Sequence, residues 1–93
     1  MKIVLEETDS SGRYVTEVEG HTVELTFSKL GASSIIIDHT GVPDALRGKK
    51  VGEALVLHAV EKAREMGKTI IPLCPFAASQ FRKHPEWRDV LKD

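Results

Sequence analysis

The single cysteine of the sequence, Cys74, lies in a segment that could activate its sulfur. Pro75 follows it directly, and proline favours the first turn of a helix, so we expect a helix to begin beside the thiol. A helix N-terminus lowers the pKa of a nearby thiol and makes it a better nucleophile. His39 is a candidate base for that nucleophile. The alternative is that Cys74 is a small buried hydrophobe and that His39 forms a structural hydrogen bond.

A second segment, residues 47 to 52, could bind an anion. It consists of Arg47, Gly48, Lys49, Lys50, Val51 and Gly52. The glycines leave room for a ligand beside the backbone, and the free amides and dipole of a helix start favour phosphate groups. The spacing matches neither the Walker A pattern nor G-x-G-x-x-G. A diphosphate site is therefore one interpretation, and a solvated basic helix start is the other.

The elements that position these residues begin with three expected strands. These are residues 2–7, 13–19 and 21–28. The third alternates apolar and polar side chains, as in an antiparallel strand with one buried face. The turn residues at 9–12 and at Gly20 are short joints, which suit hairpins.

The second half of the chain predicts a strand, a helix and a strand. The continuous apolar runs at 34–38 and 69–74 are typical of central parallel strands. Between them, apolar side chains recur at helical spacing from Val51 to Met66, and Gly67 is a suitable helix C-cap. Shorter helical segments are expected at 76–83 and after Pro85. The predicted fold class is α+β or α/β, with antiparallel N-terminal strands followed by a parallel βαβ unit.

The βαβ unit predicts where the candidate residues meet. The carboxyl ends of its two strands and the N-terminus of its helix share one edge of the sheet, which is where ligands bind in open sheets. The end of the first strand at His39, the basic segment at 47–52 and Cys74 all lie at that edge. We therefore expect one site there.

Length and composition exclude several classes of protein. A chain of 93 residues suits one domain, here 1–93, and contains no apolar run long enough to span a membrane. Thirteen basic residues against 14 acidic ones disfavour a nucleic-acid binder that would use Arg47, Lys49, Lys50, Arg82 and Lys83. The four histidines lack metal-ligand spacing, so no metal site is expected. One cysteine cannot form an internal disulfide, which predicts the cytoplasm as the compartment.

Four short runs together resemble a known family. They are His39-Thr40-Gly41-Val42-Pro43, Arg47 to Gly52, Pro72-Leu73-Cys74-Pro75-Phe76 and His84-Pro85-Glu86-Trp87. In this order and spacing they are similar to the GNAT superfamily of acetyl-CoA-dependent N-acetyltransferases, and most similar to its smallest single-domain branch. The similarity covers residues 34 to 91.

The resemblance implies a fold in which the two parallel strands splay apart and an activity that transfers acetyl groups to an amine. It implies CoA as the cofactor, with the pantetheine arm along Thr40, Gly41 and Val42 and the pyrophosphate at residues 47–52. Gln80 and Phe81 would line the cofactor, and Cys74 would be catalytic. Lys50 departs from the family glycine at its position. The short joints between the first strands imply an open acceptor side, which suits a protein or peptide amine.

Several alternatives stay open at this point. The amine could attack acetyl-CoA directly, with Cys74 protonating the leaving thiolate, or Cys74 could first take the acetyl group with His39 as base. A non-catalytic CoA-binding regulatory module is the alternative function. The acceptor and the oligomeric state do not follow from the sequence, although a monomer is compatible with it.

Overall fold

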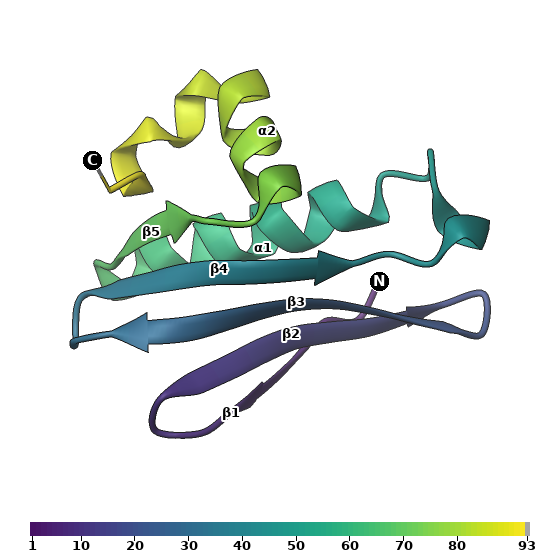
Figure 1. The fold of residues 1–93 in the computed structure, drawn as a ribbon, viewed down its shortest axis with the longest axis horizontal. Helices are drawn as coiled ribbons and strands as arrows, with labels where there is room; N and C mark the ends of the chain where they lie inside the picture. Colours follow the sequence, from purple (N-terminus) through teal and green to yellow (C-terminus); the bar gives the residue numbers. More distant parts are fainter. Residues whose placement is uncertain (93) are drawn as a thin grey trace.

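The computed structural model describes residues 1–92, which form a five-stranded sheet with helices packed against it (Figure 1). The strands lie in the order of the sequence, β1-β2-β3-β4-β5. In chain order the elements are β1 (Val4–Glu7), β2 (Ser11–Val18), β3 (His21–Leu30), β4 (Ser34–Gly41), the 3-10 helix η1 (Asp44–Leu46), α1 (Val51–Met66), β5 (Thr69–Pro72), α2 (Pro75–Lys83) and the 3-10 helix η2 (Pro85–Val90).

The sheet is mixed, as the sequence predicts. β1 to β4 pair antiparallel, and β4 pairs with β5 in parallel. The parallel pairing runs only from Ser34 opposite Thr69 to Ile37 opposite Pro72. β4 then continues to Gly41, while the chain after β5 turns into α2. The two parallel strands therefore separate beyond Ile37, and the predicted fold class is confirmed.

One hydrophobic core joins α1 to the sheet. The buried face of β3 carries Val23, Leu25 and Phe27, which alternate with polar residues on the other face. The buried stripe of α1 has helical spacing and consists of Val51, Leu55, Val56, Ala59, Val60 and Ala63. Burying a side chain of this size contributes about 1.5–3 kcal/mol. This apolar contact fixes α1 against one face of the sheet.

The two ends of α1 depend on left-handed residues. Gly67 has φ 66° and ends the helix as predicted, with its amide bonded to the carbonyls of Ala63 and Arg64. At the other end, Lys50 precedes the first helical residue with φ 61°. A side chain is strained in this conformation, which glycine adopts freely.

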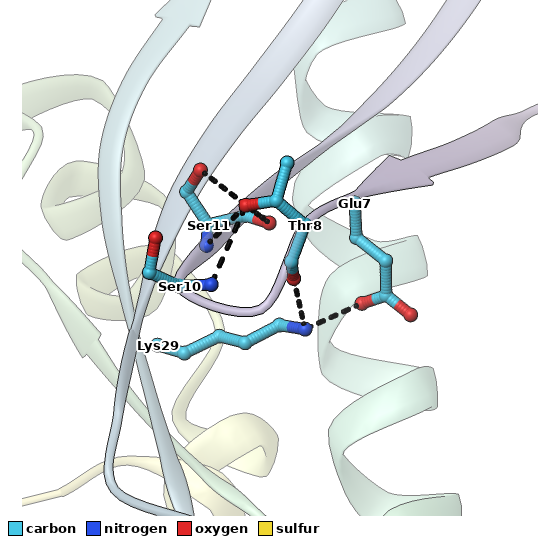
Figure 2. Close-up of polar contacts among 5 residues, drawn as sticks. All are labelled: Glu7, Thr8, Ser10, Ser11 and Lys29. Atoms are coloured by element: carbon cyan, nitrogen blue, oxygen red, sulfur yellow. Dashed lines mark hydrogen bonds and ion pairs between the residues drawn. The ribbon is translucent and has the colours of Figure 1, made fainter.

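The turn between β1 and β2 is held by side chains (Figure 2). The Thr8 hydroxyl accepts hydrogen bonds from the amides of Ser10 (3.4 Å) and Ser11 (3.2 Å). The Lys29 ammonium donates to the Thr8 carbonyl (2.7 Å) and pairs with Glu7 at 3.1 Å. The Thr8 hydroxyl and carbonyl and the amides of Ser10 and Ser11 are thus paired within the chain.

The C-terminal segment closes the edge of the sheet beyond β5. Trp87 of η2 lies edge-on against Phe81 of α2, with ring centroids 5.6 Å apart. Arg64 of α1 pairs with Asp89 of η2 at 2.7 Å, and the Lys92 amide donates to the Ile70 carbonyl. None of the helices within residues 1–92 has the length and apolar character that a membrane-spanning helix needs.

Candidate active site

A cleft of about 580 Å³ lies where β4 separates from β5, between the start of α1 and one side of α2. Its size is in the range of small-molecule sites. It is lined by Thr40, Val42, Leu46, Arg47, Gly48, Lys50, Val51, Gly52, Glu53, Phe76, Gln80 and Lys83. The cleft therefore brings together residues from the end of β4, from the predicted anion segment and from α2.

The start of α1 forms one wall of the cleft and offers backbone amides to it. In the part of the chain that the structure describes, no side chain caps this helix, and the first amides of a helix have no partner within it. Gly48, two residues before Lys50, also has a left-handed backbone, with φ 81°. Left-handed glycine in the preceding loop and the uncapped helix give this wall the character of an anion site, since the helix dipole favours negative charge there.

Gly52 lies where α1 comes closest to the other walls of the cleft. A Cβ at this position would lie 2.9 Å from Cζ of Phe76 and 3.1 Å from Cγ2 of Val42. Real Cβ atoms essentially never show the first separation, and the second is tighter than most Cβ contacts, so any larger residue would displace a neighbour. Glycine is therefore needed here for α1 to pack this closely against α2 and the segment after β4. Phe76, on the first turn of α2, is the nearest neighbour.

Gln80 contributes a buried polar atom to the opposite wall. Its side chain is 4% exposed, and its amide oxygen Oε1 has no hydrogen-bond partner. It is the one buried side-chain nitrogen or oxygen in this situation within residues 1–92. Because native proteins rarely leave such atoms unpaired, we expect this oxygen to accept a hydrogen bond from a bound ligand.

Cys74 lies directly behind this cleft, at the N-terminus of α2. It precedes the first helical residue, Pro75, as the sequence predicts. Its thiol and the Thr40 hydroxyl are 3.7 Å apart, and Thr40 lines the cleft. Cys74 is 6% exposed and belongs to the hydrophobic core, so both interpretations of the sequence apply to it. It is buried, and it is one side chain away from the cleft.

The surroundings of the sulfur shift its pKa in two directions. Burial raises the pKa of Cys74, while the Ala77 amide, the Thr40 hydroxyl and the Phe76 amide together lower it by more. The pKa of the thiol is therefore below its ordinary value. In the structure the Cys74 thiol donates its hydrogen bond to the Thr40 hydroxyl. The Ala77 and Phe76 amides at the start of α2 favour the thiolate by hydrogen bonding.

His39 does not lie beside Cys74, contrary to the sequence-based expectation. In β4, Thr40 pairs with Leu25 on the covered face of the sheet, and His39 pairs with Thr26 on the open face. The His39 ring is exposed beside Gly41. A β-bulge opposite Thr26 and Phe27 inserts Asp38 and breaks the alternation of side chains. This bulge turns Thr40 toward Cys74 and His39 away from it.

Most of the chain matches one protein family in sequence. A sequence model described as GCN5-related N-acetyltransferase matches residues 13–90. The chain belongs to the GCN5-related N-acetyltransferase family.

Solved structures of N-acetyltransferases share the fold. A protein from Staphylococcus aureus classed as a GCN5-like N-acetyltransferase is 31% identical and superposes with a TM-score of 0.71, over 96% of this chain and 87% of that one. A ribosomal-protein-alanine N-acetyltransferase from Brucella melitensis biovar Abortus 2308 is 20% identical, with a TM-score of 0.66 over 92% of this chain and 64% of that one, and shows the fold alone. A comparison with curated proteins yields no match.

Within this N-acetyltransferase, most residues that the sequence assigned to CoA line the cleft. They are Thr40, Val42, Arg47, Gly48, Lys50, Val51, Gly52 and Gln80. Gly41 and Lys49 do not line it, and the Lys49 ammonium pairs with Glu19 of the β2–β3 turn at 2.6 Å. Phe81 is buried against Trp87 and does not line the cleft, so its contact with CoA stays a prediction.

Four residues of the cleft were missed by sequence reasoning: Leu46, Glu53, Phe76 and Lys83. Phe76 is 37% exposed and packs at Gly52. The signal that could have found it is helical spacing, because Phe76, Gln80 and Lys83 are separated by four and three residues and share one side of α2.

A histidine links the rim of the cleft to the C-terminal segment of the N-acetyltransferase. The His84 ring stacks on Trp87 with centroids 4.0 Å apart. Its Nδ1 lies 3.0 Å from the Glu86 carboxylate and its Nε2 lies 3.5 Å from that of Glu53. Glu86 raises the pKa of His84, burial lowers it and Glu53 raises it further, and the net direction is upward. Glu53 of the cleft thus faces a histidine that gains positive charge readily.

Proposed function

We propose that this N-acetyltransferase uses acetyl-CoA as its acetyl donor and binds CoA in the cleft between β4, α1 and α2. The observation that carries the proposal is Gln80, a residue that lines the cleft and whose buried side-chain oxygen has no partner among residues 1–92. An unpaired buried acceptor costs about 1–3 kcal/mol. The pantetheine arm of CoA carries amide N–H groups, which are the donors that would remove this cost.

The phosphate end of CoA fits the start of α1. The uncapped amides after Lys50 and the side chains of Arg47 and Lys50 line the same wall. The close approach of Gly52 to Phe76 and Val42 leaves no room for a side chain and so keeps the wall open to a ligand. These features support a pyrophosphate at this position.

The end of β4 supports the predicted path of the pantetheine arm. β5 pairs with β4 only as far as Ile37, so the edge of β4 at Thr40 and Gly41 faces the gap between the separated strands. An extended amide-bearing chain can add to such an edge in the manner of a strand. This placement would bring the thioester toward Thr40 and hence toward Cys74.

Cys74 is the residue that we propose for the chemistry. The groups that lower its pKa favour the thiolate, the form that attacks a thioester. In a covalent route, the sulfur bonds to the acetyl carbon, the bond between that carbon and the CoA sulfur breaks, and CoA leaves as a thiolate that takes up a proton. The acceptor amine then displaces the Cys74 sulfur. In a direct route, the acceptor amine bonds to the acetyl carbon and the bond between that carbon and the CoA sulfur breaks. The Cys74 thiol gives its proton to the departing CoA thiolate, and the proton lost by the amine nitrogen restores the Cys74 thiol. Neither route uses His39, whose ring is on the other face of the sheet.

Calorimetry and a turnover assay test the donor and the activity. We expect acetyl-CoA to bind to the wild-type protein and CoA to be released when an amine acceptor is added. Binding without turnover across a library of amines and peptides would leave a CoA-binding regulatory module as the function. No binding of acetyl-CoA would reject the proposal, and a gel shift at physiological salt would then test the nucleic-acid alternative.

Mass spectrometry separates the two routes. The protein is mixed with acetyl-CoA without acceptor, alongside the variant Cys74→Ser. An acetyl adduct that the variant lacks supports the covalent route, whereas turnover without an adduct supports direct transfer. Full turnover by Cys74→Ser would remove Cys74 from the mechanism.

The acceptor side supports a protein or peptide amine. The joints between the first three strands are tight turns, at Thr8 to Ser10 and at Glu19 and Gly20, so no inserted helix encloses the open face of the sheet. Profiling with short peptides and with free polyamines checks this inference. Faster transfer to peptides is the expected result, and a preference for a small metabolite would contradict it.

A further inference from the structure

The cleft has a second cationic wall, which the residues predicted for CoA did not include. α2 presents Phe76, Gln80 and Lys83 to the cleft from one side of the helix. Lys83 is the last residue of α2, and it lies across the cleft from the start of α1 with Arg47 and Lys50. The cleft therefore carries cations on two separate walls.

The charges of these walls are largely available to a ligand. Within residues 1–92, neither Lys50 nor Lys83 forms an ion pair, and Arg47 pairs only with the exposed Asp44 of η1. Among residues 1–92, the one acidic residue that lines the cleft is Glu53, whose carboxylate lies 3.5 Å from His84. Positive charge therefore predominates in the cleft, and it lies on two walls: Arg47 and Lys50 at the start of α1, and Lys83 at the end of α2.

A ligand with two separate phosphate groups matches this arrangement better than a ligand with one. The amides and glycines at the start of α1 suit the group that approaches the backbone closely. Lys83 offers no such amides, because it stands at the C-terminal end of its helix, and it acts as a point charge on a flexible stem. CoA has this composition: a pyrophosphate within the chain and an isolated phosphate on the 3′ oxygen of its ribose.

We propose that Lys83 binds the 3′-phosphate of CoA and so makes this protein prefer CoA over dephospho-CoA. The proposal rests on the proposed function, because it assumes that the pyrophosphate lies at the start of α1. The unpaired Gln80 oxygen, one helical turn before Lys83 on the same side of α2, is the independent sign that this wall faces a ligand.

The neighbouring residue Arg82 provides a matched control. It is exposed, carries the same charge and belongs to the same helix turn, yet it lines a different groove, with Pro72, Phe81 and Arg88. Lys83 and Arg82 differ mainly in the side of α2 that they occupy. Because both are exposed at the helix end, alanine at either position should leave the fold intact, which thermal unfolding checks.

The experiment is calorimetry with CoA and with dephospho-CoA on the wild type, Lys83→Ala and Arg82→Ala. We expect the wild type to bind CoA about tenfold more tightly than dephospho-CoA, which is typical of one charge-assisted contact. Lys83→Ala should remove most of this preference by weakening CoA alone, and Arg82→Ala should keep it. The preference should also shrink as salt is added.

The other outcomes overturn the proposal and are distinguishable. An equal loss for both ligands in Lys83→Ala would place Lys83 at the pyrophosphate instead. The same effect in Arg82→Ala would show that the preference for CoA comes from the overall positive charge of the surface and not from a specific contact with Lys83. Wild-type binding without preference would overturn the 3′-phosphate contact alone, whereas failure to bind either ligand would overturn the proposed function with it.

Discussion

The β1–β2 turn and the start of α1 lie at opposite ends of the sheet, and both are polar segments with tight backbone turns (Figure 1). At the β1–β2 turn, the Thr8 hydroxyl pairs with backbone amides and Lys29 pairs with the Thr8 carbonyl and Glu7 (Figure 2). At the start of α1, no side chain caps the helix, and across the cleft the Gln80 oxygen has no partner within residues 1–92.

The difference between these regions separates structural polar groups from binding groups. A polar group paired within the chain contributes to folding, typically about 1 kcal/mol, whereas an unpaired buried one opposes it. Substitutions in the β1–β2 turn should therefore lower stability and leave CoA affinity unchanged. Substitutions in the cleft should lower CoA affinity without lowering stability.

The largest effect is expected from Gly52→Val, which tests the cleft directly. The new side chain would meet Phe76 and Val42, and Phe76, being partly exposed, can yield by moving into the cleft. CoA affinity should fall by about tenfold or more, which corresponds to about 1.4 kcal/mol. Calorimetry measures this loss. Ala54→Val places the same branched residue in the same helix without lining the cleft, and unchanged affinity in Gly52→Val would refute the assigned pyrophosphate position.

Gln80→Met should separate binding from stability. Methionine has a similar length and removes the unpaired buried oxygen, so the free energy of unfolding should rise by about 1 kcal/mol. CoA affinity should fall by about fivefold, since one hydrogen bond to the ligand is lost. Chemical denaturation and calorimetry measure the two effects. A destabilised variant with normal affinity would mean that Gln80 is structural, like Thr8.

Thr8→Val is the corresponding test at the other end of the sheet. The substitution keeps the shape of the side chain but removes the oxygen that accepts from the amides of Ser10 and Ser11. The free energy of unfolding should fall by about 1 kcal/mol while CoA affinity stays the same. Thr22→Val, at an exposed threonine of β3, controls for the general effect of valine. A loss of CoA affinity in Thr8→Val would show that the β1–β2 turn also contributes to binding.

Lys50→Gly sharpens the account of the start of α1. Glycine adopts the left-handed backbone of this position without strain, so stability should rise by about 0.5–1 kcal/mol. Lys50→Ala removes the same charge but keeps the strain, and therefore isolates the backbone effect. Thermal unfolding compares the three proteins. If the glycine variant were no more stable than the alanine variant, backbone strain at Lys50 would play no part.

The smallest effect is a pH dependence at the rim of the cleft. The pKa of His84 is raised in the folded protein, first by Glu86, against burial, and also by Glu53. The protonated ring therefore stabilises the fold fully below the unfolded pKa of about 6.5, and this contribution is lost as pH rises through the higher folded pKa.

His84→Gln should consequently lower Tm more at about pH 5.5 than at about pH 9. Glu86→Gln keeps the stacking of His84 on Trp87 and should remove much of the same dependence. Melting curves across this range measure both variants. A pH-independent loss in His84→Gln would show that stacking alone accounts for the contribution of the ring.

Much of the fold follows from the sequence. The helical spacing of apolar residues and the left-handed cap at Gly67 place α1 at the predicted residues. The strands were predicted in their correct number and order, but their ends differ: β2 begins at Ser11 and β4 extends to Gly41. These ends depend on how far β2 and β4 pair with β3, and the residue types of a segment do not specify the length of that pairing.

The candidate site was predicted in part. Short-range patterns identified the segment at the start of α1 and placed Cys74 before α2, because both follow from local helix geometry. One placement failed at longer range: His39, expected within reach of Cys74, lies on the other face of the sheet. Phe76 lines the cleft and Phe81 does not.

Local sequence patterns specify the order of strands and helices, the family, and which short segments carry glycine, cations and sulfur at element boundaries. Which of those side chains meet is set by long-range packing. A bulge at Asp38 reverses the faces of His39 and Thr40, and the packing of α2 against β4 and α1 selects the side that faces the cleft. The physical reason is that periodicity fixes the spacing along an element, whereas its rotation against neighbours depends on contacts between residues far apart in the chain.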